Sequence, residues 1–326
     1  MSKVSFIRSC LGAALACAVL VPVAQAQADY PSRPIRIVVG YPPGGSVDIA
    51  ARIVADSLGP RLRVPIVIDN QGGAAGAIAA QRVAGSPADG YTLLIGANNE
   101  LAATGLVNPS QKYDPQKDFT PVGLIATAPV LLVAGPKAGV KTLNEFVAAA
   151  KANPGRYSYG SSGVGSILHF AGELIKERAG IFMTHIPYRG TAPLTGDLAG
   201  GNIEFAMMSP AAANPFIQSG RITALAISSP KRAAAMPNVP ALAEHPLLKG
   251  YDMVGWFALV GPRGLPAEVH QKLSAALLAS LQEPAVRKRL DDVGLIAAAG
   301  REDVGAMIRS DVTQYRKLVD FAHMKD

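Results

Sequence analysis

The feature that most constrains the fold of this chain is the alternation of short β-branched runs with longer segments of helical periodicity. From residue 29 the expected order is strand, helix, strand, helix, strand, in the ranges Ile35–Val39, Val47–Leu58, Ile66–Asp69, Ala75–Val83 and Thr92–Ile95. Strands that alternate with helices in this way form βαβ units, which build a parallel sheet covered by helices on both faces. The first part of the chain therefore predicts an α/β domain.

The same alternation returns after residue 127. It begins with a strand at Val130–Ala134 and a helix at Leu143–Ala152, whose start is marked by a capping box from Thr142 to Glu145. Further strands are expected at Tyr157–Tyr159, Met183–His185, Phe205–Met207 and Ile222–Ile227, and further helices at Ile167–Ala179, after Pro193 and at Ala211–Ser219. This is a second α/β unit, and a chain of this length supports two.

The C-terminal quarter adds one apolar run, Trp256–Val260, and three helical segments at Pro266–Ser280, Pro284–Asp292 and Asp303–Met324. The last segment carries apolar residues at helical spacing, so one of its faces must pack on a domain. We expect it to return to the first lobe. The predicted organisation is lobe 1 at residues 29–127 and 252–326, with lobe 2 at residues 128–251 between them.

The N-terminus has the pattern of a secretory signal peptide. Lys3 and Arg8 precede an uncharged run, Leu11–Val21, and small residues suited to cleavage follow at Ala26 and Ala28. The run is about half of the ~20 apolar residues that a membrane-spanning helix needs. We therefore expect residues 1–26 to be removed and the mature protein to lie in the periplasm.

Cysteine content and charge exclude several classes of protein. The only cysteines, Cys10 and Cys17, lie in the segment to be removed, so the mature chain has no disulfide, thiol nucleophile or thiolate metal ligand. A lipid anchor on Cys17 is the alternative, but Ala14 stands where a lipoprotein signal has a large aliphatic residue. Without the signal, 29 of the 31 basic residues remain against 24 acidic ones. The basic residues are scattered and have no aromatic residues between them, so no nucleic-acid partner is expected.

Glycine-rich turns stand between a strand and the following helix at three places: Pro42–Ser46, Ser161–Ser166 and Tyr188–Pro193. A helix N-terminus offers free N–H groups and partial positive charge, and glycine lets an anion approach them. Ligands of open α/β sheets bind at the carboxyl ends of strands, where these turns lie. Any single turn could simply be a helix cap. Two of them, one in each lobe, would direct two helix termini at one anion when the lobes close.

Motifs for other functions do not fit. The sequence contains no Gly-x-x-x-x-Gly-Lys, and Gly163-Val164-Gly165 lacks the third glycine of the dinucleotide fingerprint. Val164 also occupies the place of the last glycine in a nucleophile elbow. The five histidines are far apart and show no metal-ligand spacing. We predict no catalytic residue, no metal and no cofactor; a secreted hydrolase or isomerase is the alternative.

Three side chains near the expected cleft have two interpretations each. His169 lies one turn into the helix after the second glycine turn, and it either lines the cleft or packs the start of that helix. Asp48 either complements the helix dipole or binds a ligand amine or hydroxyl group. Trp256, the only tryptophan, is either a core residue or a cleft wall.

A series of longer motifs extends over the whole chain. In order they are Pro34–Val39, Pro43–Asp48, Asp69–Gly76, Asp89–Leu94, Tyr113–Pro115, Asp118–Val122, Gly160–Ser166, Pro187–Pro193 and Asp197–Gly201. With these motifs the sequence resembles the Bug family, the periplasmic solute receptors of tripartite tricarboxylate transporters. It departs from many members at Tyr41-Pro42-Pro43 and at Ala97-Asn98-Asn99-Glu100.

The resemblance implies an α/β type II periplasmic-binding-protein fold, with two Rossmann-like lobes joined by crossing strands and a ligand cleft between them. It implies a small carboxylate ligand (a di- or tricarboxylate, an acidic amino acid or an aromatic acid) held mainly by backbone amides and waters, membrane permease subunits as partners, and a monomer. A sensor that presents its ligand to a membrane signalling partner is the alternative. The candidate ligand-binding residues are Tyr41, Gly44, Gly45, Ser46, Asp48, Asn98, Ser161, Ser162, Gly163, Ser166, His169, Gly190, Thr191, Ala192, Ser209 and Trp256.

Overall fold

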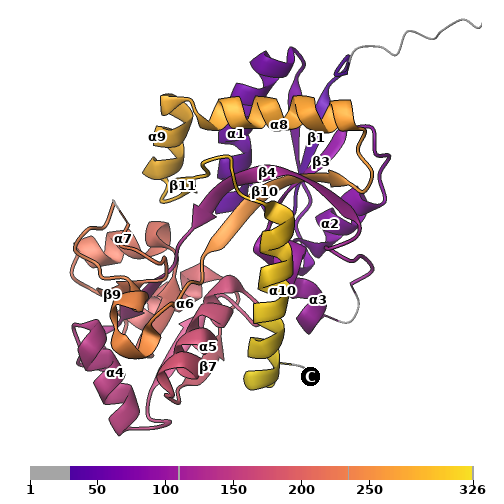
Figure 1. The fold of residues 1–326 in the computed structure, drawn as a ribbon. Helices are drawn as coiled ribbons and strands as arrows, with labels where there is room; N and C mark the ends of the chain where they lie inside the picture. Colours follow the sequence, from indigo (N-terminus) through magenta and orange to yellow (C-terminus); the bar gives the residue numbers. More distant parts are fainter. Residues whose placement is uncertain (1–29, 109–110, 234, 325–326) are drawn as a thin grey trace, which may run out of the picture.

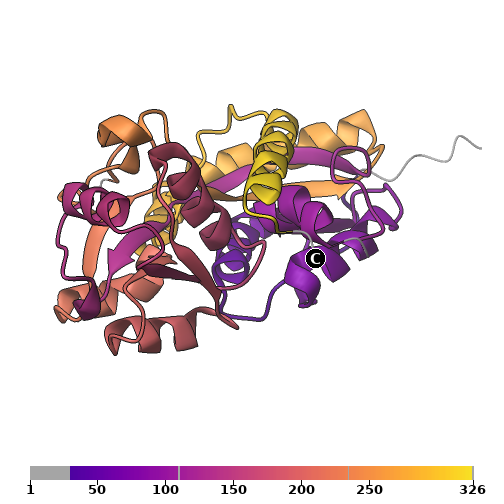
Figure 2. The ribbon, with the colours of Figure 1, turned by 90° about the horizontal axis from the view of Figure 1, so that it is seen from below.

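The computed structural model describes residues 30–108, 111–233 and 235–324. The expected signal peptide, residues 1–26, lies outside the described residues. Two β-sheets with their helices form two lobes that meet at the middle of the molecule (Figures 1 and 2). Within the described ranges, no helix combines the length and the apolar character needed to cross a membrane.

The first sheet has six strands in the order β11-β4-β10-β3-β1-β2. Their bounds are β1 Ile35–Val39, β2 Ile66–Asn70, β3 Thr92–Ala97, β4 Phe119–Ala128, β10 Gly255–Pro262 and β11 Ile296–Ala297. Strands β1, β2 and β3 are parallel, as expected from their βαβ connections. Strand β10, for which no direction was predicted, runs antiparallel to both β3 and β4. Since β4 leaves for the second lobe and β10 returns from it, the two strands must run in opposite directions.

Strand β4 was not predicted from the sequence. Pro121 and Gly123 interrupt its apolar pattern, and both residues are unfavourable inside a strand. In the structure Pro121 lies opposite Val260, beside a register shift in the β4–β10 pair, where a missing N–H is tolerated. The long pairing with β10, whose eight residues are all buried, stabilises β4.

The second sheet has five strands in the order β7-β6-β8-β5-β9. Their bounds are β5 Leu131–Ala134, β6 Ser158–Ser161, β7 Thr184–Pro187, β8 Phe205–Met208 and β9 Thr223–Ile227. Strand β6 is parallel to β7 and β8, and β5 is antiparallel to β8 and β9. The α/β class is therefore confirmed for both halves, while the proposed lobe limits at residues 127 and 252 stay a prediction.

Most helices lie where the sequence predicts them. Their bounds are α1 Ser46–Leu62, α2 Ala77–Ala84, α3 Thr104–Val107, α4 Leu143–Ala152, α5 Ile167–Ala179, α6 Thr191–Ala199, α7 Pro210–Gln218, α8 Ala267–Leu281, α9 Pro284–Asp292 and α10 Val304–Phe321. At the start of α4, Thr142 Oγ1 accepts a hydrogen bond from Glu145 N–H at 3.2 Å, as the capping box requires. Helix α6 begins at Thr191 rather than after Pro193, because a proline in the first turn removes no helical hydrogen bond.

Helix α10 packs on the first lobe, to which it was expected to return, and also on the second lobe. It contacts β4 and the turn Asn99–Ala103 of the first lobe and helix α5 of the second. The Tyr315 ring stacks on Phe170 of α5, with 4.4 Å between the ring centroids. In Figure 1 the helix lies across the junction of the two sheets. It is therefore part of the connection between the lobes.

Candidate functional site

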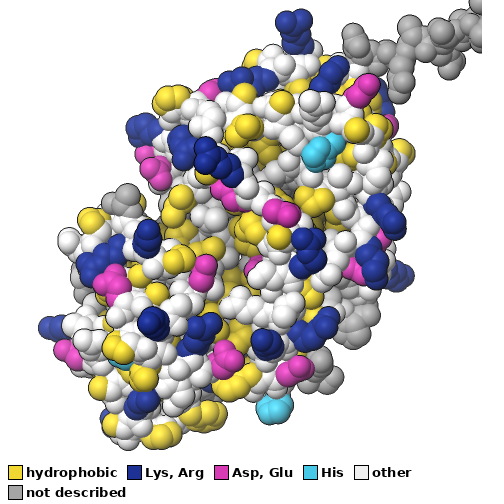
Figure 3. All heavy atoms as spheres, viewed as in Figure 1, with side chains coloured by type: hydrophobic (Ala, Val, Ile, Leu, Met, Phe, Trp, Pro, Cys, Tyr) yellow, Lys and Arg dark blue, Asp and Glu magenta, His cyan; other side chains and the backbone are white. Residues whose placement is uncertain are grey.

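A cavity of about 300 Å³ lies where the two lobes meet. The molecular surface is hollowed between the lobes (Figure 3). Residues of both sheets and of the crossing segments line it: Tyr41, Gly45, Ser46, Val47, Ala97, Asn98, Asn99, Ala128, Pro129, Val130, Ser162, Ile167, Leu168, Thr191, Ser209, Pro210, Ala211, Gly255, Phe257, Val293, Gly294 and Leu295. We call this space the central cavity.

Four helices begin at the wall of the central cavity. The first residues of these helices are Ser46 in α1, Ile167 in α5, Thr191 in α6 and Pro210 in α7, and all four line the cavity. Helices α1, α6 and α7 have no side chain that caps their first-turn amides. Uncapped first-turn N–H groups and the positive ends of helix dipoles favour an anion at this place.

Hydroxyl groups add further hydrogen-bonding capacity. Ser46, Ser162, Thr191 and Ser209 line the central cavity. Within the described part of the chain, none of these four side-chain oxygens has a hydrogen-bond partner. Each hydroxyl can donate to a ligand oxygen because no protein acceptor takes its proton.

The described lining contains no Lys, Arg, His, Asp or Glu side chain. An anion in the cavity would therefore be neutralised by helix termini and hydrogen bonds and not by an ion pair. Such a site can bind a carboxylate through several oriented dipoles, which together replace the water that the anion loses.

Asp48 does not line the central cavity, and its role in ligand binding stays a prediction. Its side chain is only 2% exposed and accepts hydrogen bonds from Gly44 N–H at 2.8 Å, Asn70 Nδ2 at 2.8 Å and Arg52 Nε at 3.0 Å. Burial raises the pKa of Asp48, but the hydrogen bonds from these donors together lower it by more. The pKa of Asp48 therefore lies below its usual value. Asp48 instead fixes the first glycine turn from behind.

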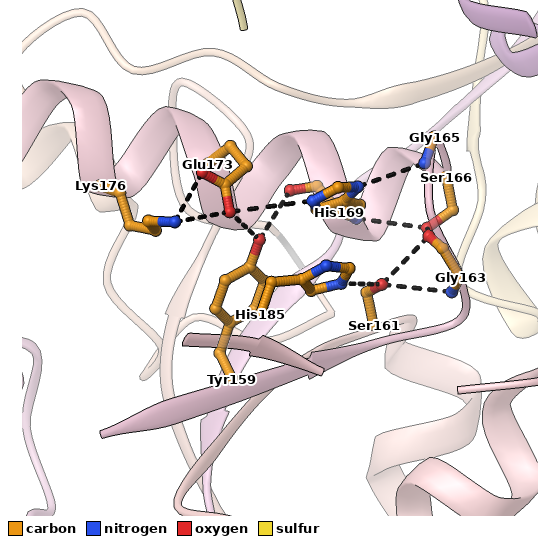
Figure 4. Close-up of polar contacts among 9 residues, drawn as sticks. All are labelled: Tyr159, Ser161, Gly163, Gly165, Ser166, His169, Glu173, Lys176 and His185. Carbon is orange, nitrogen blue, oxygen red and sulfur yellow. Dashed lines mark hydrogen bonds and ion pairs between the residues drawn. The ribbon is translucent and has the colours of Figure 1, made fainter. Parts of the chain in front are cut away.

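The second glycine turn is held by a buried polar network (Figure 4). Ser161 Oγ accepts from Gly163 N–H at 3.2 Å and shares a hydrogen bond of 2.7 Å with His185 Nε2. His169 Nδ1 accepts from Gly165 N–H at 3.2 Å, and its ring stacks on that of His185 at 3.7 Å between centroids. The network sets the backbone of the turn and therefore the start of α5.

Ser161 and His185 are as close as a catalytic nucleophile and its base, but they do not lie at the cavity as catalytic residues would. Ser161 is fully buried, and neither side chain lines the central cavity. Burial lowers the pKa of His169 to about 3 and that of His185 to about 4, so both rings are neutral near pH 7. The pair supports the turn and has no access to a substrate in the cavity.

Trp256 is a core residue, which is the first of its two interpretations. It is 1% exposed, lies outside the cavity lining, and donates from Nε1 to Asp311 Oδ2 at 2.7 Å. His169 likewise packs the start of its helix and does not line the cavity. Six other candidates lie in or beside the glycine turns but also outside the lining: Gly44, Ser161, Gly163, Ser166, Gly190 and Ala192.

Seven of the candidates are brought together around the cavity: Tyr41, Gly45, Ser46, Asn98, Ser162, Thr191 and Ser209. Two further parts of the lining were not predicted from the sequence: the crossing strands, at residues such as Gly255 and Phe257, and the segment Val293–Leu295 before β11. Phe257 belongs to the predicted apolar run Trp256–Val260, whose return to the first lobe was a usable signal. No motif marks Val293–Leu295.

A buried carboxyl group lies directly behind the wall at Tyr41. Glu100 Oε2 accepts a hydrogen bond from Tyr41 Oη at 2.6 Å, and Glu100 Oε1 accepts from Ala97 N–H at 2.8 Å. Burial raises the pKa of Glu100 to about 7, and the hydrogen bonds offset only part of this rise. Glu100 therefore positions Tyr41 while remaining fully buried itself.

Comparison with known proteins gives a consistent result. Residues 50–322 match the family described as "Tripartite tricarboxylate transporter family receptor". The chain is 37% identical over 261 residues to Protein BugT of Bordetella pertussis, which covers 79% of each chain. These matches confirm the resemblance to the Bug family.

Two solved structures of similar proteins hold carboxylates. Rpa4515 of R. palustris, solved with adipate, has a TM-score of 0.78 and 33% identity and covers 90% of this chain and 99% of its own. MatC (Rpa3494) from Rhodopseudomonas palustris, solved with bound malate, has a TM-score of 0.74 and 31% identity and covers 89% and 100%. These similarities confirm the periplasmic-binding-protein fold. The chain belongs to the family of tripartite tricarboxylate transporter receptors.

Proposed function

We propose that this protein is an extracytoplasmic receptor that captures a small carboxylate and delivers it to the permease subunits of a tripartite tricarboxylate-type transporter. The observation that carries the proposal is the convergence of four helix N-termini on a cavity whose described lining has no charged side chain. This arrangement suits an anion that must be bound and released. The similar proteins solved with adipate and malate support a carboxylate as that anion.

The proposed binding mode uses both lobes. One carboxylate group accepts hydrogen bonds from the first-turn amides of α1 and α5 and from the hydroxyl groups of Ser46 and Ser162. Thr191 and Ser209 at the starts of α6 and α7 contact the remainder of the ligand. Helices α1 and α5 belong to different lobes. A carboxylate group that contacts both of them therefore favours a closed arrangement of the lobes.

We propose that the receptor acts as a monomer without catalysis. The Ser161–His185 pair supports this, because its serine is buried and directed at a backbone carbonyl. We also propose export through the N-terminal signal, with cleavage after residue 26 or 28. The mass of the protein isolated from the periplasm would check this; an intact N-terminus there would refute it.

A thermal-shift screen of the mature chain tests the receptor proposal. The ligands are succinate, malate, citrate, adipate, aspartate, glutamate and benzoate, with glucose and ribose as uncharged controls. A ligand at one hundred times its dissociation constant adds about 2.7 kcal/mol of stability. A clear increase in melting temperature with one or more carboxylates and none with the sugars is expected. A shift with the sugars alone would refute the proposal.

A further inference from the structure

Asn98 presents one polar atom to the central cavity that has no hydrogen-bond partner among the described residues. The residue follows β3, is 2% exposed, and lines the cavity. Its Nδ2 donates to Tyr315 Oη at 2.6 Å, whereas in the described residues no donor reaches its Oδ1. A methyl group placed on Gly255 would lie 3.9 Å from this Oδ1. Since Gly255 also lines the cavity, its missing side chain leaves the oxygen uncovered.

The orientation of the Asn98 amide is fixed from helix α10. Tyr315 Oη donates its single proton to Asp311 Oδ2 at 3.1 Å. The phenolic oxygen can then only accept, so Asn98 must turn its NH₂ group toward Tyr315 and its oxygen away. Trp256 Nε1 holds the same Asp311 oxygen at 2.7 Å, and Phe170 stacks on the Tyr315 ring.

The neighbouring asparagine shows why this oxygen is unusual. Asn99 Oδ1 also lacks a partner but is completely covered by protein, so no ligand atom can reach it. Asn98 Oδ1 is a fixed acceptor at a cavity that otherwise offers amide and hydroxyl donors. A ligand carboxylate carries acceptors only, and it would leave this oxygen without a hydrogen bond, which costs free energy in a desolvated site.

Resting on the carboxylate-receptor proposal above, we infer that Asn98 selects carboxylates that carry a hydroxyl group, whose O–H donates to Asn98 Oδ1. The alternative donor, a ligand ammonium group, is disfavoured. The described lining contains no carboxylate to pair with a buried cation, and Asp48 is already occupied by Arg52 and Asn70. Tyr315 is a positioning residue for this contact, because it acts through the Asn98 amide.

Matched acid pairs that differ by one hydroxyl group test the inference. They are succinate and malate, glutarate and 2-hydroxyglutarate, and phenylacetate and mandelate, with both enantiomers of each hydroxy acid, measured by isothermal titration calorimetry. In the wild-type protein we expect about tenfold tighter binding of the hydroxyl-bearing member of the pair that binds best. In Asn98→Leu the ratio should fall to about one.

Two tyrosine variants separate positioning from general stability. Tyr315→Phe releases the amide, so the preference for the hydroxy acid should shrink at least threefold. Tyr251→Phe removes a comparable buried hydrogen bond, from Tyr251 Oη to the Ala171 carbonyl at 2.8 Å, and should leave the preference unchanged. If Asn98→Leu does not fold, the Tyr315→Phe variant still tests the inference.

The outcomes distinguish the inference from the function on which it rests. Equal binding of both members of every pair by the wild-type protein, or an unchanged ratio in Asn98→Leu and Tyr315→Phe, would overturn the role of Asn98 and leave the receptor proposal intact. Binding of none of these acids, together with no response in the carboxylate screen, would overturn both.

Discussion

The Asp48 carboxylate is surrounded by donors from Gly44, Arg52 and Asn70 and has no side open to the central cavity. Its hydrogen bonds fix the turn that precedes α1, and that turn supplies Gly45 and Ser46 to the cavity. Asp48, which the sequence predicts beside the ligand, thus acts on the backbone of the turn behind the cavity wall.

Asp48→Ala should lower the free energy of unfolding by about 1–3 kcal/mol, because Gly44 N–H, Asn70 and Arg52 lose their shared buried acceptor. It should also weaken the binding of all carboxylates by a similar factor, since the first glycine turn loses the hydrogen bonds that fix it. Asp56→Ala in the same helix removes an exposed ion pair with Arg289 and should cost less than about 1 kcal/mol. Urea unfolding and calorimetry measure both effects. A selective loss of hydroxyl-bearing ligands with unchanged stability would contradict this role.

Glu100 should make stability depend on pH. Its pKa is about 7 in the folded protein and 4.5 in the reference state. Between these values the folded state binds more protons, so the free energy of unfolding falls as pH rises from 4.5 to 7. Below this window the group is protonated in both states and the destabilisation is absent; above it, the destabilisation is complete.

Glu100→Gln should remove this dependence, because a glutamine can accept from Ala97 N–H and donate to Tyr41 without carrying charge. Relative to wild type, the variant should gain on the order of 2 kcal/mol between pH 5 and pH 8. Glu268→Gln at an exposed position controls for the change in net charge. Chemical denaturation at the two pH values provides the measurement, and parallel pH profiles for variant and wild type would rule out the assignment.

At the scale of elements, helix α5 is flanked on each side by a glycine with positive φ. Gly163 lies in the second glycine turn with φ +138°, and Gly180 caps the C-terminus with φ +60°. An added Cβ would meet nothing closer than 3.5 Å at either position, so backbone strain dominates the cost in both.

Gly163→Ala and Gly180→Ala should each reduce stability by about 1 kcal/mol. Only the first should reduce ligand affinity, by tenfold or more, because it displaces the backbone that leads into the α5 terminus at the central cavity. Titration of both variants with the same carboxylate measures the difference. Equal affinity losses, or none in either variant, would show that the turn geometry does not control binding.

The sequence predicts elements well where the signal is local. The limits of α4, α5 and α9 are those expected, because caps and apolar periodicity define them within the segment. Strand β4 was missed because Pro121 and Gly123 obscure its pattern, and only its pairing with β10 explains it. The glycine turns were found for the same local reason.

Side-chain directions within the site were less predictable. Ser162 and Ser161 are neighbours in one turn, yet Ser162 lines the cavity and Ser161 points at His185, which is 24 residues away. Asp48 is hydrogen-bonded to Asn70 and Trp256 to Asp311, and neither side chain lines the cavity. These partners come from other elements, so the sequence around a candidate residue carries no signal for them.

At the scale of the whole molecule, the two lobes share a continuous connection. Strands β4 and β10 cross between them, and α10 contacts both. The Asn98–Tyr315–Asp311–Trp256 chain of hydrogen bonds joins the cavity wall to this connection. The ligand contact proposed at Asn98 would therefore act on the segment across which the lobes would close.

The most direct test of the account compares the best carboxylate found in the screen with the analogue in which every carboxylate is replaced by a primary amide, a molecule of nearly the same shape without the carboxylate charges. Four helix N-termini recognise negative charge, so calorimetry should show at least about 100-fold weaker binding of the amide. Binding of both molecules with affinities within threefold of each other would contradict carboxylate capture by the helix termini.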